Sequence, residues 1–476
     1  MKYLSELTSG IEITETNITK DIPVEGLTQH FGKVKPGFVF FVSSDNAERY
    51  IEEALKNGAV AICAEKTYKE YPCLTVKNVR RAVAIMSRAF NNYPDKQLSV
   101  IGVVGTNGKT TTTKILGNIF SACGYRTAVI GSLGFYIGSD RYENERTTPD
   151  SPDFFRMLSK AVERKVKYVF CEISAHAIFY EKLYGVVCDV CVFTNFSQDH
   201  LDFFGTMDNY KRVKKGFFNS KNMKCGVINS DDSVGREIIR KYDVCCVSYG
   251  ISHPSDSFAI NIEYGNGTDF VANVFDDIMR IHSPLYGEYN VSNLLAALTV
   301  GKLYGITSEE LERAVLGLED VEGRFNVINW RAKIIIDYAH TPDGLERVLT
   351  CARNLCQGQL ICVFGCGGDR DRSKRPIMGK IASELSDIVV VTSDNPRSED
   401  PETIIGEICE GIDREVYRIT DRKEAVRFSM LNARQGDVIV LCGKGAESYI
   451  EIKGEKMPYS DKETCLDFIG SKLCHA

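Results

Sequence analysis

The chain contains 476 residues, of which 43% are hydrophobic and 26% are charged. These proportions are typical of a globular protein with substantial cores, and the length fits about three domains. The 64 acidic and 58 basic residues give a net charge of −6, which disfavours a protein that coats nucleic acid or an anionic membrane. No apolar run reaches the ~18 residues of a membrane span, and the N-terminal segment contains no apolar leader. We therefore expect a soluble, cytoplasmic protein that binds neither nucleic acid nor a membrane.

Strand and helix patterns alternate along three consecutive blocks of the chain. Residues 1–97 mix short apolar strands with helices, residues 98–325 alternate apolar strands with helices, and residues 326–476 repeat that alternation in a shorter block. Such alternation predicts α/β domains whose largely parallel sheets carry helices on both faces. The 17 cysteines are scattered, which fits a reducing compartment better than a disulfide framework. Cys188 and Cys191 form one Cys-x-x-Cys pair in a predicted strand, where we expect no metal or redox role.

A glycine-containing loop follows the apolar strand that ends at Val104 and opens a predicted helix. Successive backbone N–H groups in such a turn, with the positive end of the helix dipole, bind phosphate groups. The lysine of the loop can reach the β- and γ-phosphates, and the next threonine can bind Mg²⁺. The loop lacks the first glycine of G-x-x-x-x-G-K-[ST], because Val103 stands there. The residues of this predicted phosphate loop are Gly105, Thr106, Asn107, Gly108, Lys109, Thr110 and Thr111.

Two ionisable residues lie at or beyond the ends of later strands. Glu172 is late in an apolar strand, where an unpaired charge would be costly, and His200 lies in the loop after the next strand. Because ligands bind beyond the carboxyl ends of parallel strands, we expect both at the edge that carries the phosphate loop. Two interpretations are open at this point. The two side chains could hold a divalent cation on the nucleotide, or Glu172 could be a buried carboxylate with a structural partner and His200 an ordinary loop residue. On pattern alone, Lys211, Lys214 and Lys215 on the following helix fit a solvated face.

Ten ordered motifs between residue 98 and the C-terminus resemble those of the Mur ligase family. They are GTNGKTT, TTPDS, EISAH, TNFSQDHLDFFG, YNVSN, EGRF, DYAHTPDGLE, GCGGDRDRSKRP, DNPRSEDP and GKGAE. The resemblance implies a nucleotide-sugar domain over residues 1–97, a central P-loop ATPase-like domain over 98–325 and a Rossmann-like amino-acid domain over 326–476. Within the family, the motifs are similar to those of ligases that add the third peptide residue to UDP-N-acetylmuramoyl-L-alanyl-D-glutamate during peptidoglycan synthesis. A monomer is expected.

The resemblance also implies residue roles at the ATP site. Lys109 and Thr110 would serve ATP and Mg²⁺, Glu172 and His200 would be metal ligands, and Lys214 would carry a carbamate beside the metal. CO₂ adds only to a neutral amine, and we expect partial burial and the neighbouring Lys211 and Lys215 to lower the pKa of Lys214. Lys109, Glu172, His200 and Lys214 are the implied catalytic residues. The implied nucleotide contacts are Asn290, Asn293, Arg324 and Asp337.

The implied reaction has two steps. The D-glutamyl carboxylate attacks the γ-phosphate of ATP, and the amine of an amino acid then displaces phosphate from the acyl phosphate. The implied acceptor contacts are Thr147, Thr148 and Ser174, together with Tyr180 and Lys182, which stand where the family usually has Gln and Arg. The implied amino-acid contacts are Arg370, Asp394, Asn395, Pro396, Arg397, Gly443 and Glu447.

The Asp-Asn-Pro-Arg loop that ends at Arg397 bears on the choice of amino acid. meso-Diaminopimelate differs from lysine by a second carboxylate, to which a guanidinium offers a bidentate, charge-assisted pair. Lysine would leave that guanidinium unpaired beside an ammonium-bearing chain. In the family, this loop resembles the diaminopimelate-adding type, and Glu447 suits an ammonium group. Without the resemblance, an Arg after Pro would be read as a solvated loop residue.

The N-terminal block departs from the family pattern. His30, Phe31 and Gly32 replace an Asp-Ser-Arg triplet that normally helps to hold the uridine nucleotide. Ala175 and Ala446 also replace a common Ser and a common His. Three interpretations therefore stay open. The chain is a divergent peptidoglycan ligase, or a paralogue that joins an amino acid to another carboxylate, as in folylpolyglutamate or secondary-metabolite synthesis, or a nucleotide-binding partner without ligase turnover.

Overall fold

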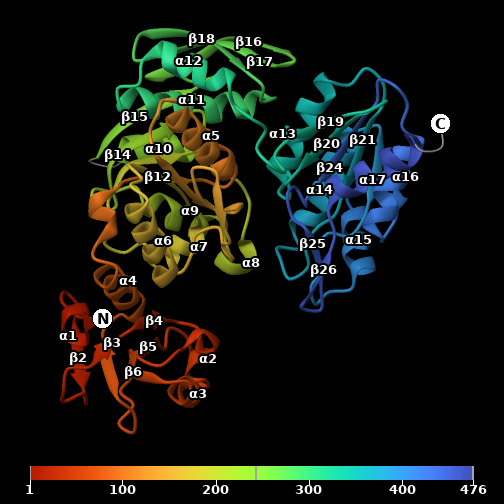
Figure 1. Cartoon of the computed structure of the whole chain (residues 1–476). Coiled ribbons are helices and arrows are strands. Elements are labelled where there is room, and N and C mark those ends of the chain that lie inside the picture. The colour runs from red at the N-terminus through yellow and green to blue at the C-terminus, as the bar shows by residue number, and fades with distance from the viewer. Residues whose placement is uncertain (1, 242–243, 474–476) are drawn as a thin grey trace.

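The computed structural model describes residues 2–241 and 244–473, and three large sheets follow one another along the chain (Figure 1). The first sheet has the order β2-β7-β6-β5-β4, in which β4 to β7 are parallel and β2 is antiparallel. Its apolar face packs on helix α4. The elements of this part are β1 (Lys2–Tyr3), α1 (Leu4–Leu7), β2 (Ile13–Thr16), β3 (Pro23–Val24), β4 (Gly26–Thr28), β5 (Phe38–Phe41), α2 (Asp45–Glu48), α3 (Ile51–Lys56), β6 (Ala59–Ala64), β7 (Cys73–Val76) and α4 (Val79–Phe90).

The second sheet has eleven strands in the order β11-β10-β9-β12-β8-β13-β14-β15-β16-β17-β18. Its central part, β9-β12-β8-β13-β14-β15-β16, is parallel. Antiparallel strands extend both ends, β10 and β11 at one and β17 and β18 at the other. The parallel strands are β8 (Ser99–Val104), β9 (Thr127–Gly131), β12 (Tyr168–Ile173), β13 (Cys188–Phe193), β14 (Met223–Asn229), β15 (Cys245–Gly250) and β16 (Ser257–Gly265); the others are β10 (Gly134–Ile137), β11 (Asp140–Tyr142), β17 (Gly267–Val274) and β18 (Asp277–Ser283).

Helices cover both faces of this sheet, because its central strands are apolar on both sides. One core lies between the sheet and α5, α11 and α12, and a second lies against α6 and α10. The helices are α5 (Lys109–Ala122), α6 (Ser151–Glu163), α7 (Ala175–Phe179), α8 (Leu201–Phe204), α9 (Met207–Gly216), α10 (Ser233–Lys241), α11 (Glu288–Leu303) and α12 (Ser308–Leu316).

The third sheet, in the order β19-β20-β24-β21-β22-β23, is parallel apart from β19. Helices α13 to α15 pack on one face, and α16 and α17 pack on the other. The elements are β19 (Asn326–Asn329), β20 (Lys333–Asp337), α13 (Pro342–Asn354), β21 (Leu360–Phe364), α14 (Lys374–Leu385), β22 (Ile388–Val391), α15 (Pro401–Cys409), β23 (Tyr417–Arg418), α16 (Arg422–Asn432), β24 (Val438–Cys442), the hairpin β25 (Tyr449–Ile452) with β26 (Glu455–Pro458), and α17 (Asp461–Leu473). The predicted α/β class with largely parallel sheets is confirmed.

Two further findings concern the described residues. None of their helices combines the length and apolar character that a bilayer span requires. Cys188 and Cys191 are free, buried thiols in β13, and burial raises the pKa of Cys188 to about 12.

Candidate active site

The predicted phosphate loop joins β8 to α5, as the sequence indicated. Gly108 has a φ of +83°, and a Cβ atom there would lie 2.6 Å from Asn293 Oδ1, so this position requires glycine. Lys109 Nζ donates to the carbonyl oxygens of Gly105 and Thr106 at 2.9 and 2.8 Å. Its ammonium is thus held over the loop, next to the first turn of α5. Burial lowers the pKa of Lys109.

Glu172, at the end of β12, is a buried carboxylate with several donors. Oε1 accepts from the Ser132 amide at 2.8 Å, and Oε2 accepts from the Thr110 hydroxyl at 3.0 Å and the Ser132 hydroxyl at 3.2 Å. A Cβ on Gly131 would lie 2.0 Å from Oε1, so the neighbouring strand must carry glycine there. The carboxylate and the Thr110 hydroxyl thus converge beside the phosphate loop, where oxygen ligands suit a hard divalent cation.

His200 and Asp199 lie on the loop after β13 at the same edge of the sheet. Burial, together with Lys109 and Lys214, lowers the pKa of His200 to about 3 despite the nearby Asp199, so its imidazole is neutral at physiological pH. Asp199 Oδ2 is 3.2 Å from His200 Nε2 and 4.0 Å from His340 Nε2. Although burial opposes ionisation, these histidines and nearby lysines lower the pKa of Asp199. Asp199 was not among the predicted site residues, and its only signal in the sequence is its place beside His200.

Lys214 lies in α9 and is only 1% exposed, so it does not belong to a solvated face. Its Nζ donates to Thr106 Oγ1 at 2.9 Å and lies 4.3 Å from the centre of the Tyr210 ring. Burial, and next Lys109, lower the pKa of Lys214 well below its usual value. The prediction that its neighbours on the helix cause this shift was wrong. Lys211 and Lys215 point to α10, where each pairs with Glu237 at 2.6 Å.

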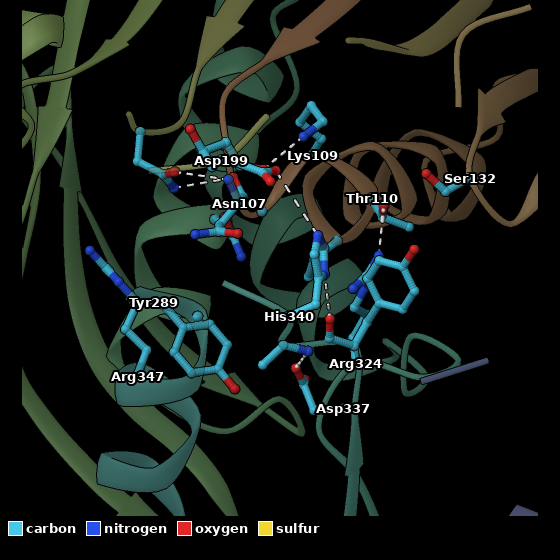
Figure 2. Close-up of a pocket in the computed structure, with 18 of the residues that line it drawn as sticks. Asn107, Lys109, Thr110, Ser132, Asp199, Tyr289, Arg324, Asp337, His340 and Arg347 are labelled. Carbon is cyan, nitrogen blue, oxygen red and sulfur yellow. Dashed lines mark hydrogen bonds and ion pairs between the residues drawn. The ribbon is translucent and has the colours of Figure 1, made fainter. Parts of the chain in front are cut away.

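The phosphate loop, Glu172, Asp199 and His200 line a cavity between the second and third sheets (Figure 2), and Lys214 contacts its wall at Thr106. Lys109 and Thr110 face it from α5, Arg324 faces it from the end of the central block, and Asp337 and His340 face it from the C-terminal block. Arg324 Nη2 donates to Thr110 Oγ1 at 3.2 Å. Asn107 in the loop donates from Nδ2 to Asp343 Oδ2 at 2.7 Å, so the central and C-terminal blocks meet at the phosphate loop. The Asp337 carboxylate accepts from the amides of Phe325 and Ala339 at 2.8 and 2.7 Å. Burial raises the pKa of Asp337.

The other predicted nucleotide contacts differ in position. Asn293 lines the cavity, whereas Asn290 lies behind it and accepts from Asn293 Nδ2 at 3.1 Å. The cavity also includes residues that the sequence analysis missed, among them Tyr289, whose buried hydroxyl has no hydrogen-bond partner among the described residues. The missed residues with polar side chains include Ser132, Asn195, Asp199, Asn229, Tyr289, Ser292, Tyr338, His340 and Arg347.

Only some of the predicted acceptor contacts reach this cavity. Thr147 and Ser174 line it, and Thr148 lies behind, donating to the Glu172 carbonyl oxygen at 2.7 Å. Lys182 is buried away from the cavity, 2.7 Å from an Asp150 carboxylate oxygen. Tyr180 is 37% exposed, and the guanidinium of Arg80 lies 4.8 Å from its ring centre.

The predicted amino-acid contacts form a second cluster in the C-terminal block. Asn395 Nδ2 donates to Glu447 Oε2 at 2.9 Å, and the Tyr338 hydroxyl, on the cavity wall, lies 3.4 Å from Glu447 Oε1. Arg397 Nη1 donates to the Gly368 carbonyl oxygen at 2.6 Å, and its Nε lies 3.5 Å from Glu451 Oε2. The remaining predicted contacts are Arg370, which is exposed, buried Asp394, Pro396 in the same loop, and Gly443, where a Cβ would lie 2.4 Å from Asp394 Oδ2.

The arrangement combines a phosphate-binding loop, a buried carboxylate and a neutral imidazole around one cavity, with the buried Lys214 in contact with Thr106 of the loop. In the described residues, no three His, Cys, Asp or Glu side chains are grouped as a metal site. The fold and this cavity define a multidomain α/β protein that binds a nucleoside triphosphate and carries a second polar cluster beside it.

Comparisons with known proteins agree with this class. The model of the Mur ligase middle domain matches residues 103–301, and that of the Mur ligase glutamate ligase domain matches residues 323–445. The chain belongs to the Mur ligase family, as its motifs suggested, and it is an ATP-dependent ligase.

Two curated relatives are named UDP-N-acetylmuramoyl-L-alanyl-D-glutamate–2,6-diaminopimelate ligase. The one from Clostridium botulinum is 38% identical over 94% of this chain and 95% of its own, and the one from Bacillus cereus is 38% identical over 93% of each. A solved structure of a ligase with the same name covers 99% of both chains at 31% identity, with a TM-score of 0.70. A MurF structure from Acinetobacter baumannii, at 18% identity and a TM-score of 0.67, shares the fold.

Proposed function

We propose that this ligase joins meso-diaminopimelate to UDP-N-acetylmuramoyl-L-alanyl-D-glutamate in peptidoglycan synthesis. The supporting observation is the loop Asp394–Arg397: Asn395 donates to Glu447, and Glu451 links Asn395 to the Arg397 guanidinium, since its amide donates to Asn395 and its carboxylate lies 3.5 Å from Arg397 Nε. Arg397 suits the second carboxylate of diaminopimelate, and Glu447 suits an ammonium group. The relatives that carry this ligase name match nearly the whole chain.

The proposed chemistry begins with attack of an acceptor carboxylate oxygen on the γ-phosphorus of ATP, which gives an acyl phosphate and ADP. The donor amine then attacks the acyl carbon, phosphate leaves, and an amide forms with loss of one proton. Lys109 and the amides of residues 105–111 would bind the phosphates and stabilise the charge that develops on them. Thr147 and Ser174, on the same cavity wall, would orient the acceptor.

Thr110, Glu172 and His200 fit Mg²⁺, because they offer a hydroxyl, a carboxylate and a neutral imidazole beside the phosphate loop. When bound, Mg²⁺ neutralises charge on the phosphoryl group. We propose that Lys214 reacts with CO₂ to give a carbamate and a proton. Its burial and its contact with Thr106 support this assignment, since a neutral amine is required and the product is an anion beside the cation site.

We further propose three domains over residues 1–97, 98–325 and 326–476, for acceptor, ATP and amino acid respectively. Each range contains its own large sheet, and strands β8 and β19 begin at Ser99 and Asn326. The enzyme would act as a monomer. It would act in the cytoplasm, where ATP and both small substrates are available.

The deciding experiment measures ADP and phosphate release with each substrate omitted in turn. We expect turnover only when both the muramoyl-dipeptide and meso-diaminopimelate are present. With ¹⁸O in the acceptor carboxylate, one label should appear in the released phosphate. Turnover when the muramoyl-dipeptide or meso-diaminopimelate is omitted would contradict the proposal, and so would released phosphate that never carries the label.

A second candidate function has the same chemistry as the first and differs only in the carboxylate that accepts the amino acid. At the divergent N-terminal positions, Phe31 stacks on Tyr50 with 4.0 Å between ring centres, and His30 Nε2 lies 3.0 Å from Asp150 Oδ2. Lys182 is paired with the same Asp150, so it is not free to contact an acceptor. These contacts favour altered acceptor recognition. A panel of carboxylate acceptors with and without the UDP group, analysed by mass spectrometry of the products, separates this candidate from the first.

A further inference from the structure

Lys444, in the loop after β24, occupies the centre of the amino-acid cluster although no motif argument gave it a role. Its side chain is fully buried. Its Nζ donates to Asn395 Oδ1 and to Glu447 Oε2, both at 2.8 Å, and lies 3.8 Å from Asp394 Oδ1. One ammonium thus connects three of the residues proposed to bind the amino acid. A buried ammonium is stable there because oxygen acceptors surround it.

The contacts of Lys444 fix the orientation of the Asn395 amide. Oδ1 accepts from Lys444 Nζ and from the Glu451 amide at 2.9 Å, whereas Nδ2 donates to Glu447 Oε2. Because two donors already occupy the carbonyl side, only the second N–H of the amide is left for a ligand. Asn395 is therefore set to donate to a carboxylate and is poorly placed to accept from an ammonium.

Lys444 also changes the electrostatic preference of the cluster. Its positive charge lies against the carboxylates of Asp394 and Glu447, which would otherwise attract cationic ligands. meso-Diaminopimelate at neutral pH has two carboxylates and two ammonium groups, whereas lysine has one more positive than negative charge. Removing Lys444 makes the cluster one charge more negative, which favours lysine relative to diaminopimelate.

We infer that Lys444 is a specificity-determining positioning residue for the amino-acid substrate. It does not touch the reacting atoms; it orients Asn395 and Glu447 and offsets the negative charge around them, so that a zwitterion with two carboxylates is selected over lysine. This inference rests on the proposed function, since it takes diaminopimelate as the amino acid.

The test compares Lys444→Met with the unchanged enzyme, using meso-diaminopimelate and lysine as separate and competing substrates at saturating ATP and acceptor. We expect the KM for diaminopimelate to rise at least about tenfold and the diaminopimelate-to-lysine ratio of kcat/KM to fall at least about tenfold. The KM for ATP should stay within about twofold, because Lys444 does not line the ATP cavity. Lys302→Met is the matched control. Lys302 is also largely buried and pairs with an acidic residue, Asp277, but both residues lie in the central block and not in the amino-acid cluster.

Lys444→Gln separates the two effects, because it removes the charge but keeps an N–H donor for Asn395. Its KM for diaminopimelate should lie between those of the unchanged enzyme and Lys444→Met, while its preference still moves toward lysine. If Lys444→Met does not fold, as judged by its melting temperature and circular dichroism, Lys444→Gln decides alone. Two results overturn the inference. One is a folded variant whose diaminopimelate-to-lysine ratio of kcat/KM is unchanged. The other is a variant whose KM values for diaminopimelate, lysine and ATP all rise equally. If the unchanged enzyme uses no diaminopimelate, the proposed function itself fails.

Discussion

At the scale of single residues, the half-buried Lys109 and the buried Lys214 both have a lowered pKa, and partial or full loss of solvation is the main cause for each. The charge of Lys109 further disfavours protonation of Lys214. Their contacts nevertheless give them different roles. Lys109 lies over the phosphate loop, where its ammonium can pair with an incoming phosphate, whereas Lys214 donates to a hydroxyl and lies against aromatic rings. The second environment suits a neutral amine that can be carbamylated.

Lys214→Ala should therefore lose activity in a way that added carboxylates partly reverse. We expect kcat to fall at least about 100-fold, because the proposed carbamate, an anion beside the proposed cation site, is lost. Formate or acetate at high concentration should restore part of the rate by occupying the vacated space. Lys215→Ala is the control, since the neighbouring Lys215 pairs with Glu237 of α10 and does not line the cavity. Steady-state rates measure the effect, and normal activity of Lys214→Ala would remove the carbamate from the mechanism.

Arg397→Ala tests the choice of amino acid directly. Loss of a charge-assisted pair to the distal carboxylate should raise the KM for meso-diaminopimelate about 30-fold or more, while the KM for lysine changes little. Arg353→Ala offers the comparison within the same domain, because Arg353 pairs with Asp387 outside the cluster. Equal KM values for diaminopimelate in Arg397→Ala and the unchanged enzyme would refute the specificity argument.

At the scale of elements, the buried parallel strands were predictable and the hairpins were not. Strands such as β8 and β12 are apolar on both faces, so they appear as continuous apolar runs, and their carboxyl ends correctly placed Glu172 and His200 at one edge. The hairpins of β16 to β18 have exposed apolar residues, such as Ile278, and a weaker pattern. Lys214 needed the resemblance, because three lysines on one helix resemble a solvated face until the packing of α9 is known.

Helices α14 and α15 are held together by a buried ion pair that the motifs did not indicate. Arg375 on α14 is fully buried and contacts Glu399 before α15 at 2.9 Å and Glu407 in α15 at 2.6 Å. Hydrogen bonds from Arg375 lower the pKa of Glu399 to about 2. Because this folded-state pKa lies below the unfolded value of about 4.3, the pair stabilises the fold above pH ~4.3 and loses its effect as the pH falls toward 2.

Glu399→Gln should therefore melt at a lower temperature than the unchanged protein at pH 7, and the gap should narrow as the pH falls from about 5 to about 3. The loss of one partner leaves part of the buried Arg375 charge uncompensated, which costs about 3 kcal/mol at neutral pH. Glu424→Gln, which removes an exposed pair with Arg427, should show little difference at any pH. Differential scanning calorimetry across that range measures both variants, and a gap independent of pH would contradict the assignment.

At the scale of the whole molecule, the cavity exists because the central and C-terminal blocks meet around it. Asn107 Nδ2 donates to Asp343 Oδ2 at 2.7 Å, and Gln198 Nε2 donates to Asp371 Oδ2 at 2.9 Å. Contacts of this kind depend on how the two blocks pack, so the motifs could name the residues on each side but not their pairing. They join the two blocks next to the ATP cavity, which residues of both blocks line (Figure 2).

Asp343→Ala should uncouple ATP consumption from amide formation, since an acyl phosphate that meets water before the amine is hydrolysed. This variant removes the contact with Asn107 and also frees Arg347, which Asp343 holds at 2.7 Å. In the unchanged enzyme, one phosphate should be released per amide formed, whereas the variant should release more phosphate than amide while the KM for diaminopimelate stays within about twofold. Glu346→Ala, on an exposed position of the same helix α13, controls for a change in that helix. Phosphate and product are measured in the same samples, and a ratio that stays at one in Asp343→Ala would show that this contact does not protect the intermediate.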